Sequence, residues 1–153
     1  MNPLPWRLLV GSVMAWSATA HAAGPYRLDD SSSTVEQPEM VMQWSPLRAG
    51  TSIGAMETRL WVNVRIDLHN WVGRHGRVYM VLPPDESPPL ELTWTTQGRM
   101  LAGRLVSGER ALVYAGVIDR PQLQDRLSVK VLAQANWVGK LRRITTYFEF
   151  EPN

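Results

Sequence analysis

The sequence predicts an all-β protein: a single antiparallel β-sandwich of immunoglobulin-like or related topology with about eight strands, preceded by a cleaved signal peptide. From residue 40 onward, apolar and polar residues alternate in short runs. Clusters of Gly, Pro, Asn and Ser separate these runs, and no segment sustains the spacing of an amphipathic helix. Period-two alternation between turn residues is typical of half-buried strands. A small β-barrel has the same profile and stays an alternative.

The first 22 residues have the features of an export signal. An arginine precedes an apolar run from Leu8 to Ala18, and the Ala-His-Ala sequence at 20–22 has the small-residue pattern of a cleavage site. The run is shorter than the roughly 20 helical residues that cross a bilayer, so cleavage after Ala22 is favoured over an uncleaved membrane anchor. We therefore expect an exported bacterial protein, in the periplasm or, alternatively, outside the cell.

Composition excludes several classes of function. The chain has no cysteine, which excludes disulfides, a lipoprotein anchor and thiol chemistry. Its formal net charge is only +2, and one positive charge, Arg7, lies in the predicted signal. This balance does not indicate nucleic-acid binding. The glycines of residues 48–54 lack the Gly-Lys-Ser/Thr ending of a phosphate loop, and no cofactor is expected.

The exported part divides into a leader and one domain. Residues 23–37 are polar and without apolar periodicity, which predicts a flexible leader. Residues 38–153 carry the alternating runs and form the predicted β-sandwich domain. The clearest strand is 61–69, with Val62, Val64 and Ile66 on the core side and Trp61 on the solvent side with Asn63 and Arg65. The other expected strands are residues 40–44, 78–82, 90–95, 100–106, 110–115, 127–132 and 144–150.

One short motif occurs twice. Residues 70–73 and 136–139 both read Asn-Trp-Val-Gly, and basic residues follow each copy. Turn chemistry or chance explains such a match as well as a duplication does. If both turns emerge at the same end of the domain, they form a basic, Trp-bearing surface. With the solvent-side Trp61, this candidate surface comprises Trp71, Arg74, His75, Arg77, Trp137, Lys140, Arg142 and Arg143. The alternative is that both tryptophans cap the core and the charges are solvated.

Catalytic and metal-binding signals are sparse. Asp67 and His69 share the predicted solvent face of one strand, and His75 in the next turn offers a third metal ligand. The alternative is a solvated polar face. No Gly-x-Ser-x-Gly nucleophile motif is present, and Asp85 and Glu86 are adjacent in a proline-rich loop, unlike the opposed carboxylates of a glycosidase.

These observations leave three hypotheses of different classes. The first is a non-enzymatic binding or assembly component of the cell envelope that contacts a protein partner through strand edges or the basic turns. The second is a module that binds an anionic glycan or a lipid headgroup with the same turns. The third is a metal protein or enzyme centred on the Asp67, His69 and His75 set. The sequence gives no indication of the oligomeric state.

Overall fold

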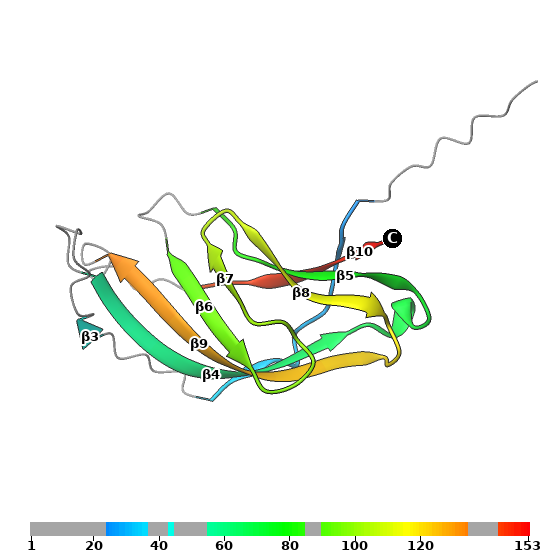
Figure 1. The fold of residues 1–153 in the computed structure, drawn as a ribbon, viewed down its shortest axis with the longest axis horizontal. Helices are drawn as coiled ribbons and strands as arrows, with labels where there is room; N and C mark the ends of the chain where they lie inside the picture. The colour runs from blue at the N-terminus through cyan, green and yellow to red at the C-terminus, as the bar shows by residue number, and fades with distance from the viewer. Residues whose placement is uncertain (1–23, 37–42, 45–54, 85–89, 135–143) are drawn as a thin grey trace, which may run out of the picture.

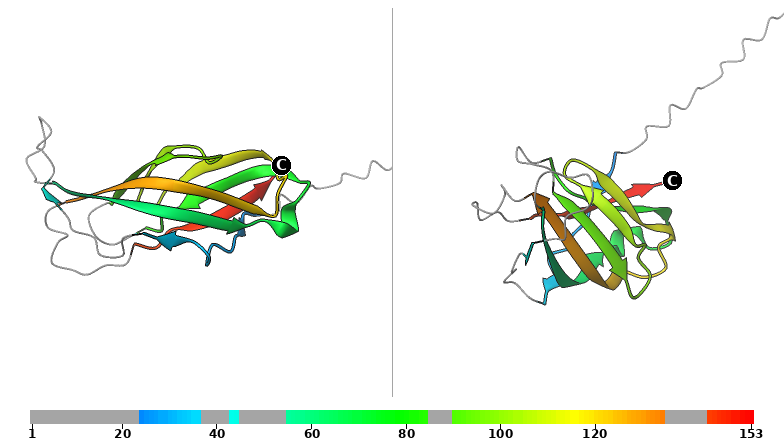
Figure 2. Two further views of the ribbon diagram at one scale, coloured as in Figure 1. Left: turned by 90° about the horizontal axis from the view of Figure 1, so that it is seen from below. Right: turned by 60° about the vertical axis from the view of Figure 1, so that its left-hand side comes forward.

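Two antiparallel sheets packed face to face make up the protein, which confirms the all-β prediction (Figures 1 and 2). The computed structural model describes residues 24–36, 43–44, 55–84, 90–134 and 144–153, so the predicted signal peptide lies outside the described residues. The elements are β1 (Tyr26–Arg27), β2 (Thr34–Val35), β3 (Gln43–Trp44), β4 (Ala55–Asp67), the 3₁₀ turn η1 (His69–Trp71), β5 (His75–Val81), β6 (Glu91–Thr96), β7 (Gly103–Val106), β8 (Arg110–Val117), β9 (Gln122–Gln134) and β10 (Tyr147–Pro152). In the described segments, no helix has the length and apolar character needed to span a bilayer.

The two sheets differ in size and strand order. Sheet A has the order β1-β10-β5-β8, and sheet B has the order β2-β4-β9-β6-β7 with β3 also paired to β4. The β4–β9 ladder runs from the Ala55–Gln134 pair to the Asp67–Gln122 pair. These two strands form the long, curved pair along the lower side of Figure 1. Apart from β6 and β7, which follow each other in the chain, the long ladders join strands from distant parts of the sequence, so the core depends on long-range pairing.

The core lies between the sheets and follows the predicted alternation. Val64 and Ile66 of β4, Trp94 of β6 and Phe148 and Phe150 of β10 all point inward and are almost inaccessible to solvent. Alternate residues on each strand point outward, as expected where one face of a sheet is buried and the other is wet. The core-side and solvent-side residues predicted for strand 61–69 are confirmed.

Several strand ends differ from the prediction. β4 begins at Ala55, six residues before the predicted start at Trp61, and β9 begins at Gln122. These extensions have little alternation of their own, and they are strands because each provides the other with a ladder of partners. Residues 100–102 are not a strand. The backbone N–H of Met100 instead donates to Asp125 Oδ2 at 2.8 Å, which holds the loop against β9.

The prediction of a flexible leader is wrong for residues 24–36. β1 pairs with β10 of sheet A, and β2 pairs with β4 of sheet B. Between them, the backbone N–H of Asp67 donates to the carbonyl of Asp29 at 2.8 Å. Leu28 is the buried side chain of this segment. Backbone hydrogen bonds, which leave no trace in side-chain periodicity, order the leader.

Candidate functional site

Trp71 of the first Asn-Trp-Val-Gly copy contributes to the core. Its ring centroid lies 4.6 Å from that of Tyr26 and 4.6 Å from that of Phe150. Gly73 follows with a φ of 84°, a left-handed conformation that suits glycine, and its N–H donates to the carbonyl of Ile118. Trp71 therefore caps one end of the core, as the alternative interpretation of this motif expects, while the neighbouring Arg74 is exposed.

The second copy lies outside the described residues, and with it Trp137, Lys140, Arg142 and Arg143. The described strand ends that flank the two copies lie apart. The first copy follows Asp67, at one end of the β4–β9 ladder, whereas the second follows Gln134, which pairs with Ala55 at the other end. The joint surface of both turns stays a prediction, and the flanking strands do not favour it.

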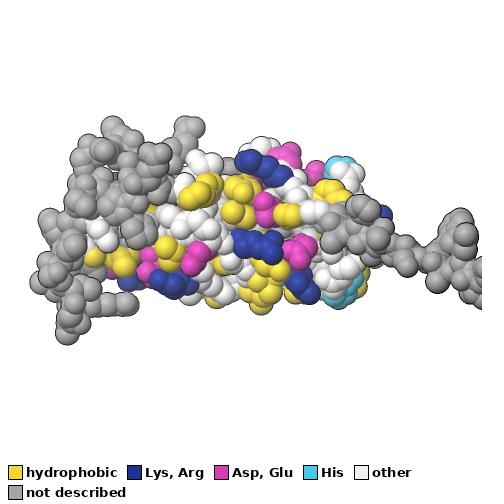
Figure 3. Space-filling model, turned by 90° about the horizontal axis from the view of Figure 1, so that it is seen from above, with side chains coloured by type: hydrophobic (Ala, Val, Ile, Leu, Met, Phe, Trp, Pro, Cys, Tyr) yellow, Lys and Arg dark blue, Asp and Glu magenta, His cyan; other side chains and the backbone are white. Residues whose placement is uncertain are grey.

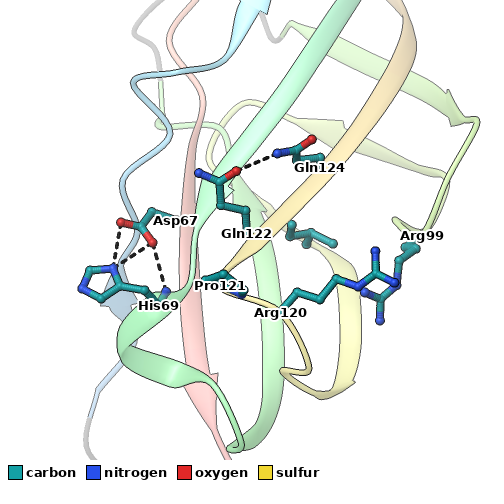
Figure 4. A pocket seen from close by; sticks show the side chains of 8 residues that line it. Asp67, His69, Arg99, Arg120, Pro121, Gln122 and Gln124 are labelled. Atoms are coloured by element: carbon teal, nitrogen blue, oxygen red, sulfur yellow. Dashed lines mark hydrogen bonds and ion pairs between the residues drawn. The ribbon is translucent and has the colours of Figure 1, made fainter.

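Asp67 and His69 form a pair (Figure 4). They do not share one strand as predicted, because β4 ends at Asp67 and His69 begins the 3₁₀ turn η1. His69 Nδ1 lies 2.9 Å from both carboxylate oxygens of Asp67, and the His69 backbone N–H donates to Oδ1 at 3.0 Å. These hydrogen bonds, the backbone one foremost, lower the pKa of Asp67. His75 instead contacts the side chain of Asn153. Among the described residues, no group of three or more His, Cys, Asp or Glu side chains is placed to hold a metal ion.

The Asp67–His69 pair lines one side of a pocket, and Arg99 and Arg120 line the other (Figure 4). Arg99 already donates to Asp119 at 2.9 Å, which lowers the pKa of that carboxyl group. The amides of this pocket bond to each other, since Gln124 Nε2 donates to Gln122 Oε1. Asp67, Arg99 and the two glutamines already have hydrogen-bond partners within the protein. This favours a structural role at the end of the β4–β9 ladder over a ligand site.

The outer face of sheet A gathers arginine and tyrosine side chains, and we call it the Arg–Tyr face. Cross-strand register brings its members into adjacent rows over four strands, because partners in a ladder share a face. Its members are Arg27 of β1, Arg77 and Tyr79 of β5, Arg110 and Leu112 of β8, and Tyr147, Glu149 and Glu151 of β10.

Cations stack on both tyrosine rings of the Arg–Tyr face. The guanidinium carbon of Arg27 lies 4.5 Å from the ring centroid of Tyr147, and that of Arg110 lies 4.2 Å from the ring centroid of Tyr79. Arg110 also donates to Glu151 at 3.0 Å. Leu112, beside Tyr79 in the ladder, is 37% exposed. The contacts orient the side chains, so this face presents a preorganised surface of tyrosine rings and arginines, with Glu149 and Glu151 of β10 among them.

Of the described residues that were predicted for binding, Arg77 belongs to the Arg–Tyr face, and His75 lies two residues before it on the same side of β5. Arg27 was not among the binding candidates because it lies in the leader that was predicted to be flexible. Tyr79 lies in the predicted strand 78–82 but was not among the binding candidates, although the alternation from His75 through Arg77 to Tyr79 is a signal for an outward side chain. Arg110 and Tyr147 share this face only because of the strand order, which no local pattern reveals.

Trp61 lies on the outer face of sheet B, as predicted, and is half-buried there. The guanidinium of Arg126 stacks 4.4 Å from its ring centroid. Arg126 also donates to both oxygens of Glu36, each at 2.8 Å, and Asn63 Nδ2 donates to Glu36 Oε1 at 3.1 Å. The Trp61, Asn63 and Arg126 side chains form what we call the Arg126 socket. In this structure it holds the leader.

The Arg126 socket makes the attachment of the leader depend on pH. The hydrogen bond with Arg126 lowers the pKa of Glu36, and Asn63 adds to the effect. A lowered pKa in the folded state gives a stabilisation that is present above the ordinary glutamate value of about 4.3 and is lost as pH falls through the lowered value. We expect hydrogen-exchange protection of the Glu36 amide, corrected for intrinsic rates, to fall in acid. The Glu36→Gln variant should be less protected at neutral pH and less sensitive to acid. Equal pH dependence in both proteins would contradict this prediction.

Charge on the visible surface is mixed, with basic and acidic side chains side by side along the face shown in Figure 3. No protein-family model matches this chain, and the searches found no similar curated protein or solved structure. Its function therefore has to be argued from its own residues.

Proposed function

We propose that this protein is an exported, non-enzymatic β-sandwich of immunoglobulin-related topology that acts as a binding or assembly component of a bacterial cell envelope. The Arg–Tyr face is its contact surface for a protein partner. Export rests on the signal-like sequence of residues 1–22. The stacked Arg–Tyr pairs of sheet A are the observation that supports binding.

The chemistry of the Arg–Tyr face is that of protein interfaces. Tyrosine and arginine are enriched at the centres of such interfaces and contribute much of the binding energy there. Stacking of Arg27 on Tyr147 and of Arg110 on Tyr79 limits the conformational freedom that these side chains lose on binding. The exposed Leu112 supplies apolar area next to them.

Strand edges are less favourable contact sites in the described part of the chain. On β8, Tyr114 donates its hydroxyl proton to the carbonyl of Val117, and the N–H of Leu101 donates to the carbonyl of Val113. On β7, the Val106 N–H is bound by the carboxylate of Glu109. Backbone groups of an edge strand that already have hydrogen-bond partners are less able to pair with a strand of another protein. A sheet face is therefore better placed than these edges to hold a partner.

The test is affinity capture from a native envelope extract with the mature protein and a Tyr79→Ala/Arg110→Ala variant. We expect the wild type to retain a specific protein and the variant to lose most of it, since truncating such residues costs about 2 kcal/mol or more each. Quantitative mass spectrometry of the captured proteins provides the measurement.

The matched control is Arg104→Ala, which removes an exposed arginine that is ion-paired with Glu91 on the outer face of sheet B. It should capture the partner as the wild type does, and circular dichroism should show all three proteins folded. Capture that is unchanged in the Tyr79→Ala/Arg110→Ala variant would overturn the assignment of the Arg–Tyr face. Binding to anionic glycan or lipid without a protein partner would instead support the second hypothesis.

A further inference from the structure

We propose that residues 24–36 form an exchangeable strap, and that the surface beneath the strap is a docking site for the same segment of a second copy of this chain. The exchange gives a swapped dimer in which each leader pairs with β10 and β4 of the other copy. This inference concerns the edges of the sheets. Because the strap carries Arg27, the exchange also supplies that member of the Arg–Tyr face from the other copy.

The strap is held by polar contacts along its length and, in β1, by stacking of Tyr26 on Trp71 and of Arg27 on Tyr147. At one end, the Leu28 N–H donates to the carbonyl of Phe148 at 2.9 Å, and the Leu28 side chain is buried. At the other end, Glu36 makes its two hydrogen bonds with Arg126. In the middle, Ser33 Oγ both accepts from the Arg65 N–H and donates to the Arg65 carbonyl. A segment with so little buried apolar surface opens locally at a lower free energy than the core.

The Arg126 socket does not need the strap in order to form. Trp61 and Asn63 belong to β4 and Arg126 belongs to β9, so all three residues are part of sheet B. Stacking on Trp61 orients the guanidinium toward the edge of the sheet. When the strap opens, an oriented cation and a row of backbone groups on β4 therefore remain without the partners that the strap supplied.

A second copy is the occupant that fits this site best. The site requires an extended segment with an apolar side chain where Leu28 lies and a carboxylate where Glu36 lies, joined by backbone that spans both sheets. The leader of another copy supplies all three features in the correct order. Exchange of an identical element conserves every native contact, which makes it a route to dimers at low cost in free energy.

Charge reversal across the Glu36–Arg126 pair tests the exchange. In Glu36→Arg the strap and socket are both basic, and in Arg126→Glu both are acidic, so neither variant can satisfy its own pair. Mixed and annealed together, the two variants satisfy both pairs only in a reciprocal heterodimer. We expect native mass spectrometry to show heterodimer in roughly tenfold or greater excess over either homodimer, as charge-assisted hydrogen bonds of this kind allow.

The control mixture contains Glu91→Arg and Arg104→Glu, which reverse an ion pair inside sheet B that strap exchange cannot restore. This mixture should show no preference for the heterodimer. A mixture of the Glu36 and Arg126 variants that likewise shows no preference, while both proteins remain folded, would overturn the proposal.

A second test avoids charge reversal, in case those variants do not fold. Val35 and Val62 are cross-strand partners, and the chain has no cysteine of its own. Chains carrying Val35→Cys are annealed with chains carrying Val62→Cys and then oxidised. We expect a disulfide-linked heterodimer in clear excess over a control in which Ser128→Cys replaces Val62→Cys. If the Val35→Cys/Val62→Cys double variant forms its internal disulfide but the mixture gives no such excess, the strap does not exchange.

Discussion

Replacing Trp94 by alanine is expected to lower the free energy of unfolding by about 3–5 kcal/mol, the range for removing a large aromatic side chain from a core. Trp94 is 2% exposed and is among the largest side chains buried between the sheets. Its Nε1–H donates to the carbonyl of Leu101 at 2.9 Å. The substitution therefore leaves both a large cavity and an unsatisfied carbonyl, and the loop at residues 97–102 loses one of its attachments.

Urea unfolding followed by circular dichroism measures this effect, and Trp61→Ala is the matched control. Trp61 is half-buried on the outer face of sheet B, so its removal creates no enclosed cavity and should cost clearly less. Similar losses of stability in the two variants would contradict the position of Trp94 at the centre of the core.

The alternation of apolar residues predicts the core because successive side chains of a strand point to opposite faces, so every second residue of a half-buried strand is apolar. In β4 every second residue faces the other sheet, and the inward position of Val62, Val64 and Ile66 was correctly predicted from periodicity. Strand ends depend on partners instead. Residues 55–60 are in β4 because residues 129–134 of β9 lie beside them, and a pairing of such sequence separation leaves no local signal.

The leader shows a second limit of sequence patterns. Its polar residues predict disorder because they offer little surface to bury. Its order comes from backbone pairing with edges that the rest of the chain supplies, and from Arg126, which lies far from Glu36 in sequence. These contacts exist only once the two sheets have assembled, so the local sequence of the leader does not predict them.

The candidate binding surface was predictable only in small part for the same reason. Arg77 was identified from its place after a tryptophan-containing turn, whereas the structure places it between two other strands, β10 and β8. Of the two interpretations of Trp71 that the sequence left open, the contacts of its ring with Tyr26 and Phe150 favour packing on the core. The strand order of sheet A determines which arginine and tyrosine side chains share the Arg–Tyr face, and the sequence alone does not reveal that order.

A Gly76→Ala substitution is expected to destabilise the protein by about 3 kcal/mol or more, at the upper end of the range for overpacking. A Cβ atom at Gly76 would lie 2.5 Å from Cζ of Phe150 and 2.6 Å from the backbone carbonyl oxygen of Glu151. Phe150 is fully buried and its ring contacts Trp71, so it has little room to move. The carbonyl belongs to β10, which pairs with β5 along its whole length. Relief of either clash therefore requires the central strands of sheet A to separate.

Gly24→Ala is the control for this substitution, because a Cβ at Gly24 has no atom within 4 Å. Urea unfolding should leave that variant within about 0.5 kcal/mol of the wild type, as for surface changes in general. A Gly76→Ala protein as stable as the Gly24→Ala protein would mean that β5 and β10 do not approach as closely as the structure shows. A second substitution separates local crowding from general intolerance of side chains at position 76. Phe150→Leu shortens the side chain that the new methyl group meets, so Gly76→Ala should cost less in that background than in the wild type.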